Sequence, residues 1–368
     1  ITMQQNNITQ VYWKNLPELL SPQGKPNQSL KNFDPEFIDI VDYIIRITHR
    51  IWEQKNIALC NDYYAEYCPV HTLGGYSDDV ATVIKNTLLT LAAFPDRTLI
   101  GENVVWRDLG ENNGYYSSHR ITSIMTNKNP SEFGASTGKT GRVTTIADCV
   151  CYENKIVYEW LMRDNSFLVK QLGISLIDAA THFANLPTNE DFEVWRAQEI
   201  IRIKAQQATT HQWHTPLDDS SEKFAQFWVN TLFNKKALGE VKNIYHKNAK
   251  LQWPGGVEAV GIPAIRGVFI QWLAQSPEAS ATCDHISVVP FEDDATDIAI
   301  RWSVAGTFTP KNEQFSRYTG QCFFVMAATH MRIINGKISE EWTVFDEVAA
   351  YANIIRDYNN SDAGQGVE

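Results

Sequence analysis

Apolar residues recur with the period of a helix near the start of each half of the chain. From residue 33 they stand at Phe37, Ile40, Val41, Ile44, Ile45, Ile47 and Ile51, which is the spacing of one buried helix face. The stretch FDPEF before them predicts a helix start, with Asp34 as the N-cap and Pro35 in the first turn. A matching helix is predicted from Ser221, and further helices are predicted over residues 79–91 and 262–273.

Long strands joined by polar hairpins follow these helices in each half, including residues 99–126 and 283–309. Helices followed by a run of strands are typical of an α+β domain. Outside these regions, residues 1–32 predict a polar N-terminal arm, residues 176–217 a helical connection, and residues 359–368 a disordered tail.

Two stretches of the chain carry the same pattern 182 residues apart. ENKIVYEWLMRD spans Glu153–Asp164 and NGKISEEWTVFD spans Asn335–Asp346, with Lys-Ile, Glu-Trp and a final Asp at equal spacing. At this offset the segments 119–164 and 301–346 align without a gap and share nine identical residues of 46. We therefore predict a tandem duplication, with one domain over residues 33–175 and a second over residues 218–358.

Composition narrows the class of protein. A chain of 368 residues is long enough for two cores, and its net charge of -11 argues against a nucleic-acid partner. No apolar run reaches the roughly 18 residues that a membrane span needs, so no membrane partner is expected. Six cysteines without zinc-ligand spacing predict neither a disulfide framework nor a metal site, and favour a reducing, cytoplasmic setting. Because the chain begins with Ile1, the sequence leaves open whether a targeting segment has been removed.

Several short motifs, in the same order in both halves, resemble one known family. They are AAFPD (92–96), STGK (136–139), QLG (171–173), IRWSVAGT (300–307), YTGQ (318–321) and RIINGKISEEW (332–342). Together they resemble the SnoaL-like polyketide cyclase family of the nuclear transport factor 2-like superfamily. The resemblance implies two tandem cone-shaped α+β domains, each a curved antiparallel sheet wrapped around N-terminal helices with an internal apolar pocket.

The resemblance also carries expectations about chemistry and assembly. Such domains often pair sheet to sheet, which implies an intrachain pseudo-dimer and allows a homo-oligomer. In the family, a pocket aspartate is the acid and base for an intramolecular aldol closure, without cofactor or metal. We therefore expect a small hydrophobic ligand or substrate as the partner, and no cofactor.

The two aspartates that end the repeated motif are the leading catalytic candidates. Alternate side chains of a strand share a face, so Asp164 lies on the side of Trp160, and Asp346 on the side of Trp342. We expect this apolar side to face inward, where a desolvated carboxyl has a raised pKa and suits a base. In the alternative interpretation each aspartate only caps the helix that follows it. Glu341 is expected on the outer face, paired with His330 and Arg332.

Two histidines are further acid–base candidates. His71 follows the first helices, and His119 lies on a strand that aligns with Arg301. The pocket lining is predicted to come from Trp106, Trp160, Trp253, Trp302, Trp342 and Arg301, although tryptophans also serve as plain core residues. These residues favour a polyketide cyclase- or isomerase-type enzyme acting on a small hydrophobic carbonyl compound. A non-catalytic protein that binds an apolar small molecule and an epoxide-hydrolase-like enzyme remain the alternatives.

Overall fold

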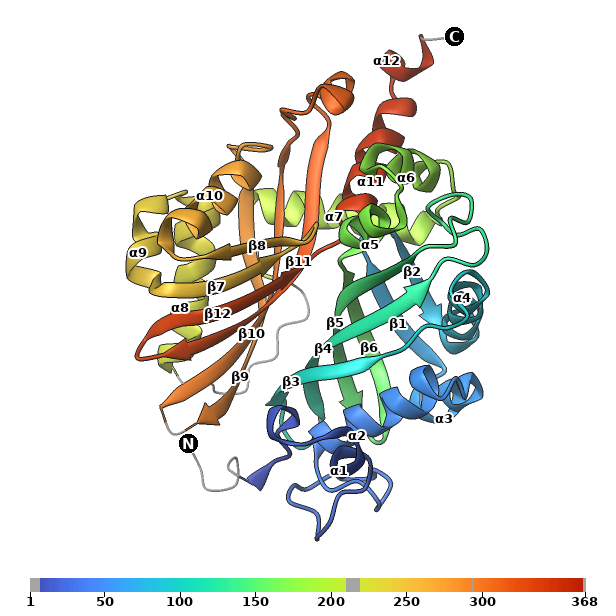
Figure 1. Ribbon diagram of the computed structural model, residues 1–368, viewed down its shortest axis with the longest axis vertical. Coiled ribbons are helices and arrows are strands. Elements are labelled where there is room, and N and C mark those ends of the chain that lie inside the picture. The colour runs from blue at the N-terminus through green and yellow to red at the C-terminus, as the bar shows by residue number, and fades with distance from the viewer. Residues whose placement is uncertain (1–6, 210–218, 293, 367–368) are drawn as a thin grey trace.

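A computed structural model describes residues 7–209, 219–292 and 294–366 of the protein, and Figure 1 shows its two halves side by side. Each half contains a six-stranded sheet, in the order β2-β1-β6-β5-β4-β3 or β8-β7-β12-β11-β10-β9. The first sheet consists of β1 (Tyr67–Thr72), β2 (Gly75–Asp79), β3 (Ile100–Asp108), β4 (Tyr115–Thr126), β5 (Thr140–Tyr152) and β6 (Lys155–Arg163). The second consists of β7 (Tyr245–Trp253), β8 (Val257–Val260), β9 (Ser280–Glu292), β10 (Ala295–Thr307), β11 (Cys322–Ile334) and β12 (Lys337–Val344).

The identical strand orders confirm the α+β class and the two tandem domains. Each sheet is mixed, however, rather than wholly antiparallel as predicted, because β1 runs parallel to β6 and β7 runs parallel to β12. Both β1 and β7 enter their sheet directly from the preceding helices. No hairpin joins either strand to its parallel neighbour, so the connection does not impose opposite directions.

The helices lie mostly where the apolar period predicts them. The first domain has α2 (Ile40–Thr48), α3 (Cys60–Tyr63), α4 (Val80–Ala93) and α5 (Asn165–Leu172), and the second has α8 (Asp219–Val229), α9 (Val241–Ile244), α10 (Ile262–Leu273) and α11 (Glu347–Asn359). The predicted start at Asp34 is wrong by about one and a half turns. Residues 34–37 instead close a turn, from Phe37 N to Asp34 O, and the side chain of Asp39 caps α2 by accepting from Asp42 N at 2.8 Å.

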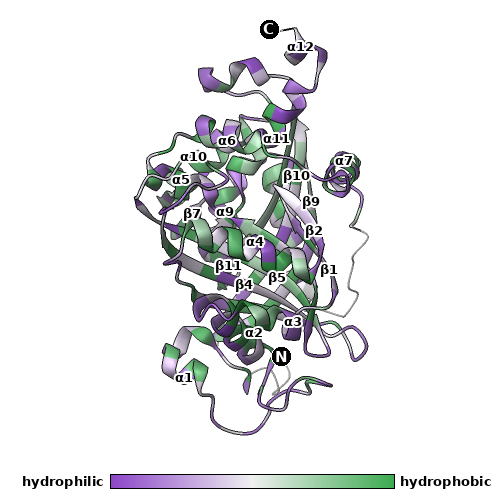
Figure 2. Ribbon diagram, turned by 90° about the vertical axis from the view of Figure 1, so that its right-hand side faces the viewer, coloured by the Kyte–Doolittle hydropathy of each residue, from purple (hydrophilic) through white to green (hydrophobic). Residues whose placement is uncertain are grey.

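The predicted connection is helical and packs against the second domain. It contains α6 (Leu176–Ala184) and α7 (Glu190–Lys204), while residues 210–217 lie outside the described part of the chain. Figures 1 and 2 show α7 beside β9 and β10. Arg202 of α7 donates to Asp284 of β9 at 3.0 Å, and Arg196 pairs with Asp357 of α11 at 2.5 Å. These ion pairs fix the connection to the domain that follows it.

Both chain ends contain more structure than their composition predicts. In the N-terminal arm, α1 (Leu16–Leu20) begins with a capping box between Asn15 and Glu18. Ile8, Val11 and Leu19 of the arm are buried in the first core. The predicted disordered tail includes the short helix α12 (Asp362–Gln365), whose turn forms through backbone bonds to Ser361 O.

The two sheets pack face to face through reciprocal arginine–tryptophan stacks. The guanidinium of Arg301 from β10 lies 3.9 Å from the ring centre of Trp160 in β6. In the mirrored contact, Arg120 from β4 lies 3.7 Å from the ring centre of Trp342 in β12. Desolvated cation–π contacts of this kind are worth about 2 kcal/mol each. The sheet faces that carry the two tryptophans therefore form the interface between the domains.

This packing corrects the predicted facing of the repeated strand. Glu159 and Glu341 point into their own domains, where Glu159 accepts a hydrogen bond from Tyr64 and Glu341 accepts one from Tyr245. Glu341 lies opposite Met331 and does not form the predicted pair with His330 and Arg332. The prediction assumed that one face of the sheet meets solvent, whereas here both faces are buried.

The gapless alignment of the two halves is also wrong by one residue in one strand. Arg120 pairs with Ile146 across β4 and β5, and Arg301 pairs with Ala328 across β10 and β11. The structural equivalent of Arg301 is therefore Arg120, not His119. The shift arises because the loop after β10 (308–321) is one residue longer than the loop after β4 (127–139).

Aromatic rings fill the interior of the second domain. Trp302 stacks on Phe233 at 4.3 Å between ring centres and meets Trp228, Trp253 and Trp272 edge-on or tilted at 5.7 to 6.4 Å. Trp302 is fully buried and Trp253 is 5% exposed. In this domain the space that the cone was predicted to leave open is occupied by the protein's own side chains.

Replacing Arg301 should strongly destabilise the fold. Arg301 is 4% exposed, stacks on Trp160, donates to the hydroxyl of Tyr116 at 3.2 Å and lies 4.0 Å from the carboxylates of Asp148 and Asp284. Because Arg301→Met leaves those carboxylates buried without their cation, we expect urea unfolding to show a loss of about 3 kcal/mol. The exposed Arg317 is the control, and Arg317→Met should change the unfolding free energy by less than about 0.5 kcal/mol. If Arg301→Met and Arg317→Met change the unfolding free energy equally, Arg301 does not have the described role in the interface.

Candidate functional site

Asp164 lies where the two domains meet. It caps α5 through Phe167 N, at 3.3 Å from its Oδ1, and the same oxygen accepts from the hydroxyl of Ser166 at 3.2 Å. A third donor comes from the other domain, since Gly255 N in the β7–β8 turn lies 2.9 Å from Oδ1. These three bonds all go to Oδ1, so Oδ2 is the oxygen that they leave unengaged.

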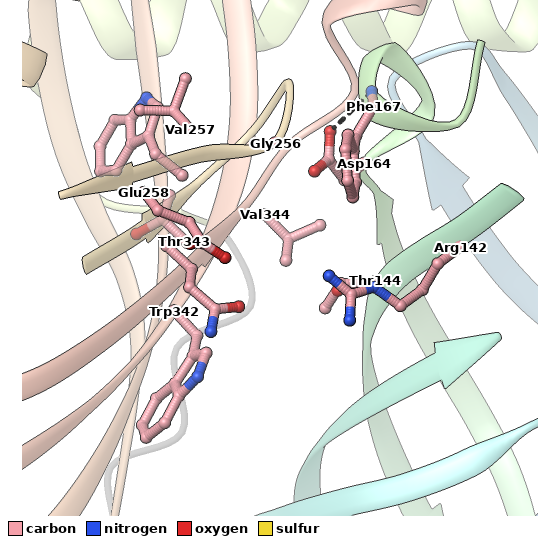
Figure 3. A pocket seen from close by; sticks show the side chains of 12 residues that line it. Arg142, Thr144, Asp164, Phe167, Gly256, Val257, Glu258, Trp342, Thr343 and Val344 are labelled. Carbon is pink, nitrogen blue, oxygen red and sulfur yellow. Dashed lines mark hydrogen bonds between the residues drawn. The ribbon is translucent and has the colours of Figure 1, made fainter. Parts of the chain in front are cut away.

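A cleft at this junction is lined by both domains (Figure 3). Its empty space, with the open mouth included, is about 440 Å³. Polar and apolar side chains contribute about equally to its lining, so a ligand there could make both kinds of contact. The lining residues are Arg142, Thr144, Asp164, Phe167, Gln252, Trp253, Gly256, Val257, Glu258, Trp342, Thr343 and Val344.

Burial raises the pKa of Asp164 to about 6. Loss of hydration disfavours the carboxylate, and the backbone amides of Gly255 and Phe167 and the hydroxyl of Ser166 offset only part of that cost. A carboxyl with this pKa is mostly ionised at pH 7 and is a stronger base than an ordinary aspartate. Asp164 can therefore take up and return a proton near neutral pH.

The backbone of the β7–β8 turn is shaped to fit Asp164 and its helix. Gly255 and Gly256 both have positive φ, +84° and +74°, a conformation that glycine adopts without strain. A Cβ on Gly256 would stand 2.4 Å from the ring of Phe167 in α5. The Gly-Gly pair therefore allows the close approach that brings the Gly255 amide to the carboxylate of the other domain.

Asp346 has the equivalent position in the second domain but a different environment. It caps α11 through Ala349 N at 3.0 Å and accepts from Asn165 Nδ2 at 2.7 Å. Burial raises its pKa to about 7, as it does that of the neighbouring Glu347. Asp346 is not among the residues that line the cleft. Of the two predicted aspartates, the structure brings only Asp164 to this site.

The predicted histidines lie away from the cleft. His119 is 3% exposed inside the first domain, where burial and the charge of Arg120 lower its pKa to about 3. His71 stacks on Trp195 and its Nε2 lies 2.6 Å from the hydroxyl of Tyr158. The contacts of His71 lie within the first domain and between that domain and α7, so neither histidine joins Asp164.

The predicted lining residues divide among four places. Trp253 and Trp342 line the cleft. Trp160 and Arg301 stack on each other at the domain interface, and Trp302 fills the second core. Trp106 packs edge-on against Tyr115 in the first core, at 6.3 Å between ring centres.

Sequence reasoning missed the polar residues that share the cleft with Asp164. Arg142 comes from β5, Gln252 from β7 and Glu258 from β8. The turn sequence Trp-Pro-Gly-Gly (253–256) is the signal that could have drawn attention to this edge, because a glycine pair often marks close backbone approach. Pairing that turn with Asp164 required knowledge of how the two domains dock.

The described residues contain neither a cluster of metal ligands nor a helix that could span a membrane. Within residues 7–209, 219–292 and 294–366, no group of three or more histidine, cysteine or acidic side chains is arranged to hold a metal ion. In the same ranges no helix combines the length and apolar character of a membrane span. All six cysteines are free thiols.

The raised pKa of Asp164 should make the stability of the protein depend on pH. Its folded-state pKa of about 6 lies above the ordinary 3.8, so the folded state binds this proton more tightly than the unfolded state. The resulting stabilisation is complete below about pH 4 and is lost as the pH rises through 6. Asp164→Asn keeps a capping acceptor but cannot titrate. From pH 4 to pH 7, we expect urea unfolding to show that wild type loses up to roughly 3 kcal/mol relative to Asp164→Asn.

Asp178 provides the control for this measurement. It is exposed in the first turn of α6, and Asp178→Asn should follow the wild-type pH dependence. If the unfolding free energy of Asp164→Asn depends on pH as that of wild type does, the Asp164 carboxyl is not buried as described.

Comparison with known proteins finds a family match within the second half of the chain. The family model described as SnoaL-like polyketide cyclase matches residues 223–354. No curated protein matches the chain. Among solved structures, IdmH from Streptomyces antibioticus, a candidate polyketide cyclase, has 18% identity, covers 36% of this chain and 98% of its own, and gives a TM-score of 0.31.

Two further solved structures show similar values. A candidate polyketide cyclase from Acidithiobacillus ferrooxidans has 19% identity, with coverage of 36% of this chain and 92% of its own and a TM-score of 0.31. TsrD from Streptomyces laurentii has 17% identity, with coverage of 38% and 99% and a TM-score of 0.32. The resemblance seen in the sequence is confirmed: residues 223–354 form a SnoaL-like domain, and the first half of the chain repeats its strand order.

Proposed function

We propose that the protein is an acid–base enzyme of the polyketide cyclase or isomerase type, acting on a small hydrophobic carbonyl compound in the junction cleft. The observation that carries this proposal is the buried carboxyl of Asp164, with a pKa raised to about 6, on the wall of a cleft lined by polar and apolar side chains. The match of residues 223–354 to the SnoaL-like family supports it.

The proposed reaction begins with proton removal by the Asp164 carboxylate. The proton comes from a carbon beside a carbonyl group, and the electron pair of the broken C–H bond forms an enolate. The enolate carbon then bonds to a second carbonyl carbon of the same substrate, whose oxygen becomes an alkoxide. That alkoxide takes the proton back from Asp164, so the carboxylate is restored and no other reactant is consumed.

Arg142 is the group placed to stabilise the enolate oxygen. It belongs to the lining of the same cleft, and Figure 3 shows its guanidinium directed into the space faced by Asp164. A positive charge beside a developing oxyanion lowers the barrier to its formation. The donors on Oδ1 hold the Asp164 carboxyl in one orientation, so both domains contribute to the site.

A non-catalytic binding protein is the second candidate. The hydrogen bonds of Asp164 to Phe167 N and Ser166 are those of an ordinary helix cap, which favours this interpretation. The cleft also contains an acid–arginine–acid set, Asp164, Arg142 and Glu258, that corresponds in part to an epoxide-hydrolase-like arrangement. In the binding alternative the cleft would hold an apolar ligand without exchanging its protons.

Proton exchange into a model ketone tests the proposal without knowledge of the natural substrate. We expect the wild-type protein to accelerate the exchange of the C1 protons of 2-tetralone in D2O, followed by NMR. Asp164→Asn keeps the helix cap but removes the base, and should lower the protein-dependent rate by about 100-fold or more. Asp346→Asn is the matched control, since it caps the equivalent helix outside the cleft and should exchange as wild type does.

The two candidate functions give different results in this experiment. If wild type binds 2-tetralone but does not accelerate exchange, the binding protein is correct and the enzyme proposal fails. Equal loss in Asp164→Asn and Asp346→Asn would assign the effect to helix capping rather than to a base in the cleft.

A further inference from the structure

The interiors of the two domains differ at equivalent positions. Trp302 of β10 corresponds to Ile121 of β4, as the strand pairing shows. Phe345, which follows β12, corresponds to Arg163 at the end of β6. Trp302 and Phe345 are 0% and 1% exposed and pack among the aromatic rings of the second core. The first domain therefore has a smaller side chain and a cation where the second has two large rings.

Solvent reaches the inner face of the first sheet. Ala147 and Leu161, on the inner side of β5 and β6, are half-buried, whereas the equivalent Thr329 and Thr343 of the second domain are 0% and 3% exposed. The opposite side of β5 and β6 packs against the second domain, through Asp148, Trp160 and their neighbours. The accessible surface of Ala147 and Leu161 is therefore on the inner side of the sheet.

Two arginines lie at this surface without a close ion pair in the described part of the chain. Arg163 shares the inner face with Leu161 and lies opposite Thr145. Arg97 follows α4, and its Nε is buried without a hydrogen-bond partner. Neither guanidinium forms a hydrogen bond or a close ion pair with any residue in the described part of the chain. Burial, together with the positive charge of Arg163, lowers the pKa of Arg97 to about 10, so the two cations are close enough to repel each other.

The acidic side chains around these arginines are engaged elsewhere or stand farther away. Glu53 accepts a hydrogen bond from Leu99 N, and Glu159 accepts one from the hydroxyl of Tyr64. The charge of Arg163 also acts on Glu132, Glu159 and Asp346, but none of these carboxyls forms an ion pair with it among the described residues. Holding two partly desolvated guanidiniums together costs free energy unless an anion lies between them.

We propose that Arg97 and Arg163 bind the carboxylate of an organic acid whose apolar body lies along Ala147 and Leu161 inside the first domain. Guanidinium groups match the planar geometry of a carboxylate and donate two parallel hydrogen bonds to it. The ligand replaces, in the first domain, the volume that Trp302 and Phe345 occupy in the second. This site is separate from the junction cleft, because neither arginine lines that cleft.

His119 adds a polar group to the same face. It lies on β4 opposite Ala147, and its Nε2 is buried without a hydrogen-bond partner. The lowered pKa keeps the imidazole neutral at pH 7, so the ring can offer one N–H or one acceptor without adding charge. A ligand with a second polar group near its carboxylate fits this arrangement.

A pair of small probes with the same shape tests the charge requirement. Phenylacetate and its neutral counterpart phenylacetamide are titrated into the full-length protein and followed by isothermal calorimetry. We expect the carboxylate to bind at least tenfold more tightly than the amide. Arg163→Gln and Arg97→Gln should each remove this preference, and Arg163→Phe, which introduces the residue of the second domain, should abolish binding of both probes.

Two control variants separate this site from the proposed enzyme. Arg142→Gln changes an arginine of the junction cleft, and Asp164→Asn removes the proposed base; both should bind the probes as wild type does. Thermal unfolding of each variant establishes that it is folded. Equal affinity for the two probes, absence of binding, or a loss caused by Arg142→Gln but not by Arg163→Gln would overturn the proposal, whatever the outcome of the exchange experiment.

Discussion

The packing of the two sheets against each other is the constraint on which the rest of the structure depends. Sheets that pack face to face usually do so through apolar side chains, yet here Arg120 and Arg301 lie buried in the interface, and each charge needs compensation. Each guanidinium obtains it by stacking on a tryptophan of the other domain. Around them, Ser118 bridges Asp148 and His330, and Asn103 donates to Asp297 at 3.0 Å. Polar groups at this depth are tolerated only because they have such partners.

The packing of the sheets explains the repeated motif. Its lysine, glutamate, tryptophan and aspartate each have the same structural role in both halves. The lysine reaches backbone carbonyls near the short helix before the first strand of its sheet, through Lys155 to Asp62 O and Lys337 to Lys242 O. The glutamate accepts from a buried tyrosine, the tryptophan carries the arginine of the other domain, and the aspartate caps a helix. The repeated residues therefore maintain the structure that the two domains share. The differences between the halves, such as the exchange of Phe345 for Arg163, are where the two domains acquire separate properties.

The α+β class, the duplication and the positions of α4 and α10 could be predicted from the sequence, because they depend on local patterns of residues. Helical periodicity and caps act within a few residues, and the spacing Glu-Trp-x-x-x-Asp survives in both halves. The side of each strand that faces its own domain's interior could not be predicted. Alternating apolar and polar residues distinguish an inner from an outer face only when one side of the sheet meets solvent. Asp164 could be chosen as a candidate, but its Gly255 partner and its cleft depend on contacts across 91 positions of the chain. The one-residue offset between Arg120 and Arg301 likewise depends on a loop length that nine identities in 46 positions could not reveal.

The most direct test of the account is a double-mutant cycle across the domain interface. Arg301→Met, Trp160→Leu and the double variant are compared with wild type by urea unfolding. If the stack joins the two sheets in solution, the coupling between the two substitutions should be about 1–2 kcal/mol, as expected for a desolvated cation–π contact. Additive effects of the two substitutions, with no coupling, would show that these residues do not touch and that the sheets do not pack through these faces.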